Sequence, residues 1–148
     1  MEIINYFESG GREHWLAEIR KCDWRAAPVL AEFLENGTFS EKLGDGVLFL
    51  LTDGDRLVSF LTFASRDWID DTSLYPWIGF VFTAPEYRGH RYAGRLIERC
   101  EEIAREHNVK QIYINTDHVG LYEKYGFEFK ENRVDIYGGD SRIYVKSI

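Results

Sequence analysis

Several basic residues and glycines gather near the middle of the chain, where a segment with helical periodicity begins. Arg88, His90, Arg91 and Arg95 bring potential positive charge to the end of a helix where the macrodipole favours negative charge instead. This placement becomes favourable if a polyanion binds, because free amides of the first helical turn can donate to phosphate oxygens. Residues 88–94 are therefore a candidate phosphate site. Taken alone, the cluster fits a solvated basic helix start equally well.

The elements that must position this segment follow from hydrophobic periodicity. Strand-like runs are expected at residues 2–7, 47–52, 56–64, 77–83, 109–115, 127–131 and 142–146. Helical periodicity is found at residues 12–22, 28–36, 91–107 and 118–125. Asp53, Gly54 and Asp55 indicate a tight turn between antiparallel strands, and the last two strands should also form a hairpin.

The basic segment follows the most apolar of these strands. Residues 77–83 should lie near the middle of a sheet, buried on both faces. The strand, the long helix and the next strand then form a parallel crossover unit. Residues 81–94, which include Pro85 in the turn, resemble motif A of the GNAT (GCN5-related N-acetyltransferase) family. Arg88 and Ala93 match the ends of the motif, whereas Arg91 stands where its inner glycine usually lies.

A second resemblance to the same family lies downstream. Asn115 ends a strand, and residues 121–127, which include Tyr122, Gly126 and Phe127, look like motif B. His118 replaces a customary alanine. The order of elements is also similar to that of the family over essentially the whole chain. The resemblance implies an α/β (α+β) fold with a mixed, mostly antiparallel sheet, flanked by helices, in which a central parallel strand pair splays.

The resemblance further implies an acyltransferase that moves the acetyl group of acetyl-coenzyme A (acetyl-CoA) to a primary amine by direct attack. Pantetheine would pair with the backbone of the central strand, and the pyrophosphate would bind at the turn and helix start. Arg91 is expected to point outward, toward the phosphates. The cosubstrate-binding residues implied in this way are Val81, Phe82, Thr83, Arg88, Gly89, His90, Arg91, Tyr92, Ala93, Gly94 and Asn115.

Tyr122 is the general acid that the resemblance implies. A phenol with a reference pKa of about 10 stays protonated at neutral pH and can protonate a departing thiolate. The alternative for Tyr122 is a core aromatic residue. No general base is evident, because Trp77 stands where many family members carry a glutamate. Asp117 suits a helix N-cap better than a base, and His118 belongs to a residue type that often acts as a base but could simply pack.

Two further groups of residues could contribute to an acceptor pocket. Asp70 and Asp71 could line it and attract a cation, although acids in exposed loops are usually only solvated. Trp24, Trp68 and Trp77 could form its walls or belong to the core. The four histidines show no metal-ligand spacing with cysteines or carboxylates, so no metal is expected.

The length and net charge of the chain limit the number of domains and the kinds of partner. A chain of 148 residues predicts one domain, residues 1–148. A net charge of −7 argues against nucleic-acid and anionic-membrane partners and suits a cationic acceptor, either a small-molecule or a peptide amine. Cys22 and Cys100 are expected to be free thiols of a cytoplasmic protein. The sequence leaves oligomeric state open, and a homodimer is compatible with this family.

Two rival functions remain on sequence grounds. A noncatalytic sensor that binds acetyl-CoA is compatible with Arg91 in place of glycine and with the missing strand glutamate, although Tyr122 argues against it. A dinucleotide-binding module would need its glycine-rich turn after an early strand and a carboxylate at the end of the next strand. The sequence has neither feature, so this second rival is disfavoured.

Overall fold

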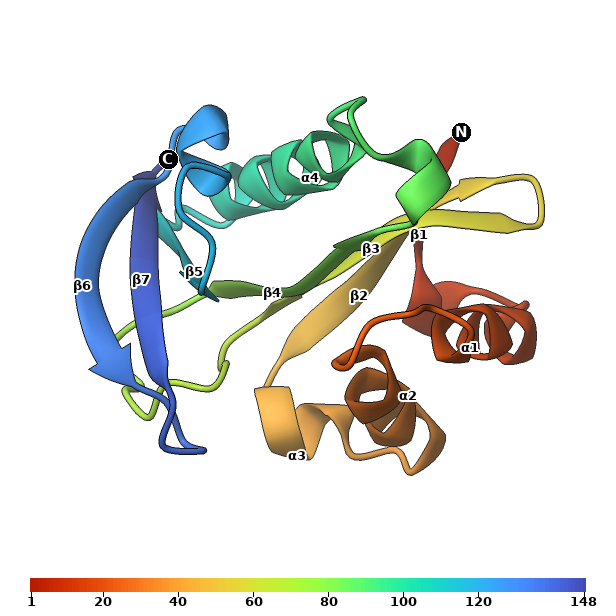
Figure 1. Cartoon of the computed structure of the whole chain (residues 1–148), viewed down its shortest axis with the longest axis horizontal. Helices are drawn as coiled ribbons and strands as arrows, with labels where there is room; N and C mark the ends of the chain where they lie inside the picture. The colour runs from red at the N-terminus through yellow and green to blue at the C-terminus, as the bar shows by residue number, and fades with distance from the viewer.

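One twisted sheet runs through the computed structural model, which describes residues 1–148 (Figure 1). Its seven strands lie in the order β1-β2-β3-β4-β5-β7-β6, and every neighbouring pair is antiparallel except β4 and β5. The mixed, mostly antiparallel sheet with a central parallel pair is thereby confirmed. The strands are β1 (Glu2–Asn5), β2 (Gly46–Asp53), β3 (Arg56–Ala64), β4 (Trp77–Thr83), β5 (Gln111–Thr116), β6 (Glu128–Val134) and β7 (Asp140–Ser147).

Helices cover both faces of this sheet (Figure 1). α4 (Tyr92–Glu106) lies on one face, and α1 (Arg12–Arg20), α2 (Ala27–Glu35) and α3 (Phe39–Leu43) lie on the other. Each face therefore encloses its own apolar core, one beneath α4 and one beneath the three N-terminal helices. No helix is both long and apolar enough to cross a membrane.

The amphipathic pattern of α4 explains how it is held on the sheet. Leu96, Ile97, Cys100 and Ala104 are buried on one side of the helix and pack in the core beneath it. Their spacing of three to four residues per turn places them on a single stripe. Because this stripe fixes the rotation of α4, the N-terminal end of the helix is presented beside the end of β4.

β4 and β5 pair only at the beginning of β4. The paired residues are Trp77 with Tyr113 and Ile78 with Ile114, and no pairing follows. Just beyond this point β4 shifts its register against β3, and Phe80 adopts a φ of 48°. A positive φ is strained for a bulky residue and is retained only where the surrounding structure enforces it. The parallel pair therefore separates in the middle of the sheet, as expected.

The expected helix at residues 118–125 is wrong in extent. Only Tyr122–Tyr125 are helical, as the short 3-10 helix η3, and the preceding residues form a turn. Gly120 explains the difference, because its φ of 87° interrupts a right-handed helix. α3 was not expected, since its five residues are too few to show a periodic pattern. The expected antiparallel hairpins β2–β3 and β6–β7 are both confirmed.

Gly126 ends η3 in a left-handed conformation, with a φ of 90°. We expect Gly126→Ala to lower the free energy of unfolding by about 1–2 kcal/mol, because a Cβ is disfavoured in this region. An added Cβ would also lie 3.0 Å from Cε of Lys146. Urea denaturation measures the change. Gly10→Ala is the matched control, because nothing lies within 4 Å of its Cβ position and its φ is not positive.

Candidate active site

A cavity of about 530 Å³ lies where the end of β4 meets the start of α4. We call it the α4 cavity. Nine of the residues that the resemblance implies as cosubstrate-binding or catalytic line it, together with Trp24, Tyr87, His118, Leu121 and Tyr125. The nine are Val81, Phe82, Thr83, Arg88, Gly89, Arg91, Tyr92, Ala93 and Tyr122.

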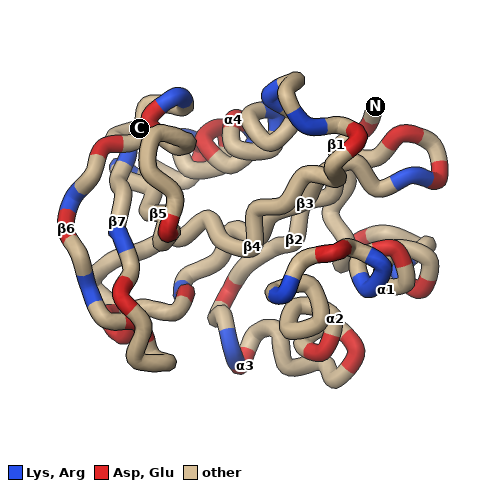
Figure 2. Tube along the Cα trace, viewed as in Figure 1, with Lys and Arg blue, Asp and Glu red and all other residues tan.

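The start of α4 offers this cavity uncapped amides and positive charge. No side chain caps this end of the helix, so amides of the first turn remain available to an anion. Figure 2 shows Lys and Arg residues gathered at the same end of α4. Nε of Arg88 donates to the carbonyl oxygen of Thr83 at 2.9 Å, and its guanidinium lies 5.5 Å from the ring centroid of Phe82. The Arg88 side chain is thereby held against the end of β4.

Arg91 explains how a residue other than glycine fits this turn. It precedes α4 in the left-handed conformation, with φ 58° and ψ 33°. This is the conformation that glycine adopts without cost, whereas another residue loses about 1–2 kcal/mol there. The Arg91 guanidinium extends over the ring of Tyr125, 5.8 Å from its centroid, at the border of the α4 cavity. Arg91 therefore adopts a conformation that glycine would adopt without cost, and it adds a positive charge at the border of the α4 cavity.

His90 and Gly94 do not line the α4 cavity. They border a neighbouring cavity of about 330 Å³ together with Arg95, Glu98 and Glu101. Gly94 is buried, and a Cβ added there would lie 2.7 Å from Cε1 of Tyr125. The missing side chain of Gly94 thus makes room for the Tyr125 ring, and the ring packs directly on the first turn of α4.

A second cavity, also of about 530 Å³, lies on the other side of the gap between β4 and β5. We call it the hairpin cavity, because the β6–β7 hairpin closes one side. Its acidic residues are Asp67, Asp117, Asp135 and Asp140, whereas Arg25 is its only lysine or arginine. Its aromatic walls are Trp24, Trp68, Phe80, Tyr122 and Tyr137.

The hairpin cavity also contains a polar atom that no protein group satisfies. Oδ1 of Asn115 is buried and has no hydrogen-bond partner. A buried carbonyl of this kind costs free energy until a donor reaches it. Asn115 lies in β5 just beyond the last residue paired with β4, so the unsatisfied oxygen is located where the strands separate. Asn115 therefore belongs to the hairpin cavity and not to the α4 cavity.

The two cavities meet at four residues, Trp24, Val81, His118 and Tyr122, which line both. Tyr122 is 6% exposed, and burial raises the pKa of its phenol, with smaller contributions from Tyr125 and from the charge of Asp67. The phenol therefore stays protonated at neutral pH. A proton donor between two cavities can serve a reaction in which ligands from both sides meet.

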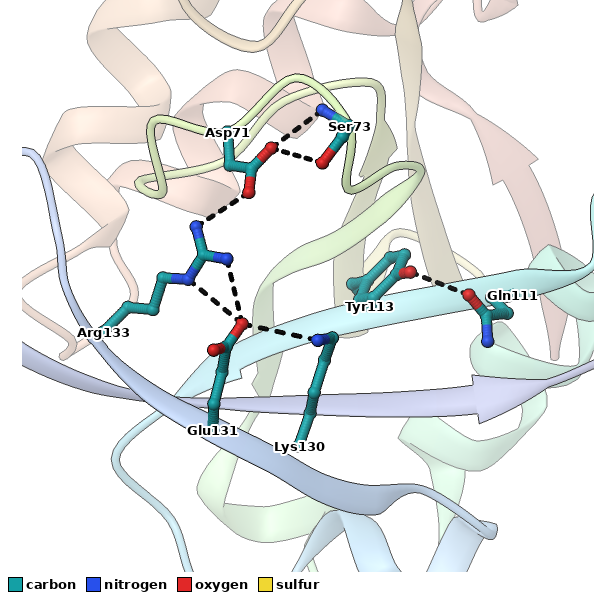
Figure 3. Close-up of polar contacts among 7 residues, drawn as sticks. All are labelled: Asp71, Ser73, Gln111, Tyr113, Lys130, Glu131 and Arg133. Carbon is teal, nitrogen blue, oxygen red and sulfur yellow. Dashed lines mark hydrogen bonds and ion pairs between the residues drawn. The ribbon is translucent and has the colours of Figure 1, made fainter.

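The loop acids Asp70 and Asp71 line neither cavity, which favours the alternative that they are surface acids without a role in an acceptor pocket. Asp71 accepts hydrogen bonds from Ser73 and from Nη1 of Arg133, the latter at 2.8 Å (Figure 3). These bonds lower the pKa of the Asp71 carboxyl to about 2. Glu131 also contacts Arg133, so Asp71 belongs to a surface network that ties its loop to β6.

The remaining candidate residues differ in whether they border a cavity. Asp117 is exposed and is not a helix N-cap, because η3 begins only after Leu121. His118 borders both cavities, and Trp24 and Trp68 border the hairpin cavity. Trp77 does not, because its side chain is buried in the core and Nε1 donates to the carbonyl oxygen of Leu74.

Asp67 is one of the cavity residues that the sequence did not single out. It follows β3 and lies in the hairpin cavity, where burial and the charge of Asp135 raise the pKa of its carboxyl to about 7. An amide hydrogen bond from Trp68 opposes this shift in part. The only signal in the sequence is an acid soon after an apolar strand, and Asp70 and Asp71 give nearly the same signal. Both cysteines are free, and no group of three or more metal-binding side chains is found.

Several solved structures share this fold. An acetyltransferase from Streptococcus agalactiae 2603 aligns with a TM-score of 0.69 and 23% identity, covering 99% of this chain and 98% of that one. An aminoglycoside 6'-N-acetyltransferase, solved with coenzyme A, aligns with a TM-score of 0.69 and 14% identity, covering 99% and 97%.

A third structure, solved with acetyl-CoA, is from Bacillus anthracis str. Ames and is assigned as a streptothricin acetyltransferase. It aligns with a TM-score of 0.57 and 18% identity over 70% of this chain, and the chain spans 63% of that protein's length. No curated protein matches the sequence significantly. The model of the acetyltransferase (GNAT) family matches residues 13–127, which is most of the chain and includes both motifs. The chain therefore belongs to the GNAT family of acetyltransferases.

Proposed function

We propose that residues 1–148 form one domain that transfers the acetyl group of acetyl-CoA to a primary amine of a cationic small molecule or peptide. The observation that carries this proposal is the meeting of the α4 cavity and the hairpin cavity at Tyr122 and Val81, where β4 separates from β5. A transfer between two bound molecules needs two sites that open onto one reacting centre. This arrangement supplies both sites.

The α4 cavity fits acetyl-CoA. Beyond Ile78 the β4 backbone has no partner in β5, and an extended, amide-containing ligand can pair with such a strand edge. The Val81–Thr83 segment would hold the pantetheine arm in this way. The uncapped start of α4, with Arg88 and Arg91 beside it, would hold the pyrophosphate. Acetyl-CoA supplies the activated acetyl group as a thioester.

Two groups of the chain would assist the transfer. A backbone amide of β4 near Val81 can donate to the thioester carbonyl oxygen as negative charge develops there. The Tyr122 phenol, at the junction of the cavities, can donate its proton to the departing coenzyme A thiolate. Because burial raises the pKa of this phenol, the proton is retained until a strongly basic acceptor forms beside it.

The hairpin cavity favours a cationic acceptor. Its four aspartates outnumber its single arginine, and its aromatic side chains can contact a cation through their ring faces. The aminoglycoside 6'-N-acetyltransferase that shares this fold acts, by its name, on aminoglycosides. Polyamines and aminoglycosides are accordingly the first acceptor classes to test, followed by amino acids and peptide N-termini.

A thiol-release assay tests the proposal against the noncatalytic sensor. The purified chain is incubated with acetyl-CoA and each acceptor class, and free coenzyme A is measured with a thiol reagent. We expect release that depends on both acetyl-CoA and a cationic amine, and little release with anionic amines. Tight binding of acetyl-CoA in a parallel titration, with no release for any amine, would support the sensor instead.

A further inference from the structure

Asp67 occupies a distinctive place beside the central strand. A Cβ built on Gly79 would lie 3.4 Å from Oδ2 of Asp67, so the carboxylate rests directly against the β4 backbone. Gly79 follows Ile78, the last residue of β4 that pairs with β5. The absence of a side chain at Gly79 thus brings a carboxylate to the point where the two strands separate and where the hairpin cavity begins.

No cation in the protein neutralises Asp67. Its side chain takes part in none of the ion pairs of the structure. Burial opposes the ionised form of Asp67 most strongly, the Trp68 amide favours the ionised form, and the Asp135 charge also opposes it. The charged and titratable groups that face the cavity from the surrounding elements are Arg25 before α2, Asp117 and His118 after β5, Tyr122 in η3, and Asp135, Tyr137 and Asp140 in the β6–β7 hairpin.

The other carboxylates of the cavity are less suited to exchange protons with a ligand. Asp135 accepts hydrogen bonds from the amides of Tyr137 and Gly139 at 2.8 and 3.0 Å, so it holds the turn of the hairpin. Asp117 and Asp140 are exposed to solvent. Asp67 alone combines partial burial, contact with β4 and a pKa raised to about 7.

We propose that Asp67 is the general base of the reaction and takes a proton from the ammonium form of the bound acceptor. This inference rests on the proposed acetyl transfer. Proton removal frees the nitrogen lone pair, a C–N bond forms at the acetyl carbonyl carbon, and the C–S bond breaks. Tyr122 protonates the thiolate, and the second proton of the nitrogen restores the Tyr122 phenol. Asp67 returns its proton to solvent, so an ammonium ion and acetyl-CoA give an amide, coenzyme A and one proton.

The charge of Asp67 also acts on Tyr122. Burial is the main cause of the raised pKa of the Tyr122 phenol, and the Asp67 carboxylate adds a smaller contribution in the same direction. When Asp67 accepts the proton of the amine, this negative charge disappears and the phenol becomes a stronger acid. Protonation of Asp67 in the hairpin cavity therefore makes the Tyr122 phenol a better proton donor before the thiolate leaves.

The test compares Asp67→Asn with the wild type across pH. We expect kcat for the best amine to fall by about 10²-fold or more, as is typical for loss of a general base. In the wild type, activity should fall as pH drops through about 7, because the carboxylate becomes protonated there. Asp67→Asn should lose this acid limb, whereas Asp67→Glu, which keeps a carboxylate, should retain one.

Asp70→Asn is the matched control, because it removes the same charge from an exposed position that lines neither cavity. Its acid limb should remain. Unchanged kcat and pH profile in Asp67→Asn would overturn the inference, and so would a raised KM with kcat and the acid limb intact, which would make Asp67 a binding residue only. Absence of thiol release by the wild type with every amine would instead refute the proposed acetyl transfer itself.

The free energy of unfolding shows whether Asp67→Asn loses activity through catalysis or through a folding defect. The native state keeps the Asp67 proton up to about pH 7, whereas the unfolded chain releases it near pH 4. Wild-type stability therefore falls as pH rises from about 4 to 7. Asp67→Asn removes this loss, so its free energy of unfolding at pH 7.5 should equal or exceed that of the wild type. A strongly destabilised Asp67→Asn would contradict the raised pKa, and the wild-type acid limb would then decide the proposal.

Discussion

Replacing Tyr122 with phenylalanine is expected to lower kcat by about 10²- to 10⁴-fold, the usual contribution of a general acid. The substitution removes one oxygen atom and keeps the ring that packs against Phe127. Acetyl-CoA affinity should therefore change little, because the α4 cavity keeps its shape. Without the phenol, the thiolate must leave unprotonated or take its proton from water. Steady-state kinetics and a binding titration with acetyl-CoA measure the two quantities separately.

Tyr113→Phe is the control for Tyr122→Phe. Tyr113 is a buried tyrosine of β5 whose hydroxyl donates to Gln111 (Figure 3), and it borders neither cavity. Its loss should leave kcat close to that of the wild type. If Tyr122→Phe turned over as fast as Tyr113→Phe, Tyr122 would be only a core residue, the alternative that the sequence left open.

The double substitution Arg88→Glu and Arg91→Glu should raise the Kd for acetyl-CoA by about 10²- to 10⁴-fold. Hydrogen bonds to charged groups contribute about 1.5–3 kcal/mol each, and 1.4 kcal/mol corresponds to a tenfold change in Kd. Both side chains border the α4 cavity beside the uncapped start of α4. The substitutions replace attraction for the pyrophosphate with repulsion. Isothermal titration with acetyl-CoA at fixed ionic strength provides the measurement.

Arg105→Glu is the control for this charge reversal, because Arg105 lies in the last turn of α4, away from the cavity. It changes net charge in the same direction and should leave the Kd within about twofold of the wild type, as expected for screened charges far apart. A double variant that bound acetyl-CoA as tightly as the wild type would exclude the start of α4 as the phosphate site.

Much of the fold could be predicted because its signals are local. The stripe Leu96, Ile97, Cys100 and Ala104 defines α4, and the tight turn around Gly54 defines the first hairpin. The extent of the helix expected at residues 118–125 could not be predicted from local periodicity, because the left-handed conformation of Gly120 is set by the tertiary path of the loop. Periodicity alone does not reveal such a constraint.

Some residues of the site could likewise be predicted from the local sequence, whereas others are brought together only by the tertiary fold. Residues of motif A lie together because they are neighbours in sequence, so the α4 cavity could be anticipated. Asp67 and Asp135 are far apart in sequence, and only the β3–β4 register and the β6–β7 hairpin bring them into one cavity. Burial in that cavity is the main cause of the raised pKa of Asp67, and the charge of Asp135 adds to it. In the sequence Asp67 resembles Asp70, and only the folded structure distinguishes the two acids.

Arg91 illustrates a departure from the motif that the backbone tolerates. The left-handed conformation that glycine would adopt freely is retained, with a φ of 58°. The strain is compatible with a functional role, since such strain is characteristic of ligand-binding turns. The conformation of Arg91 therefore lowers stability, while its side chain adds a positive charge at the border of the α4 cavity.

The most direct test of the proposed activity follows the acetyl group itself. The chain is incubated with acetyl-CoA carrying an isotope label in the acetyl group, together with a polyamine, and the products are separated and analysed by mass spectrometry. We expect the label to appear in an amide of the polyamine, in an amount equal to that of the coenzyme A released. Label that remained on coenzyme A, or that appeared only as free acetate, would contradict transfer to an amine.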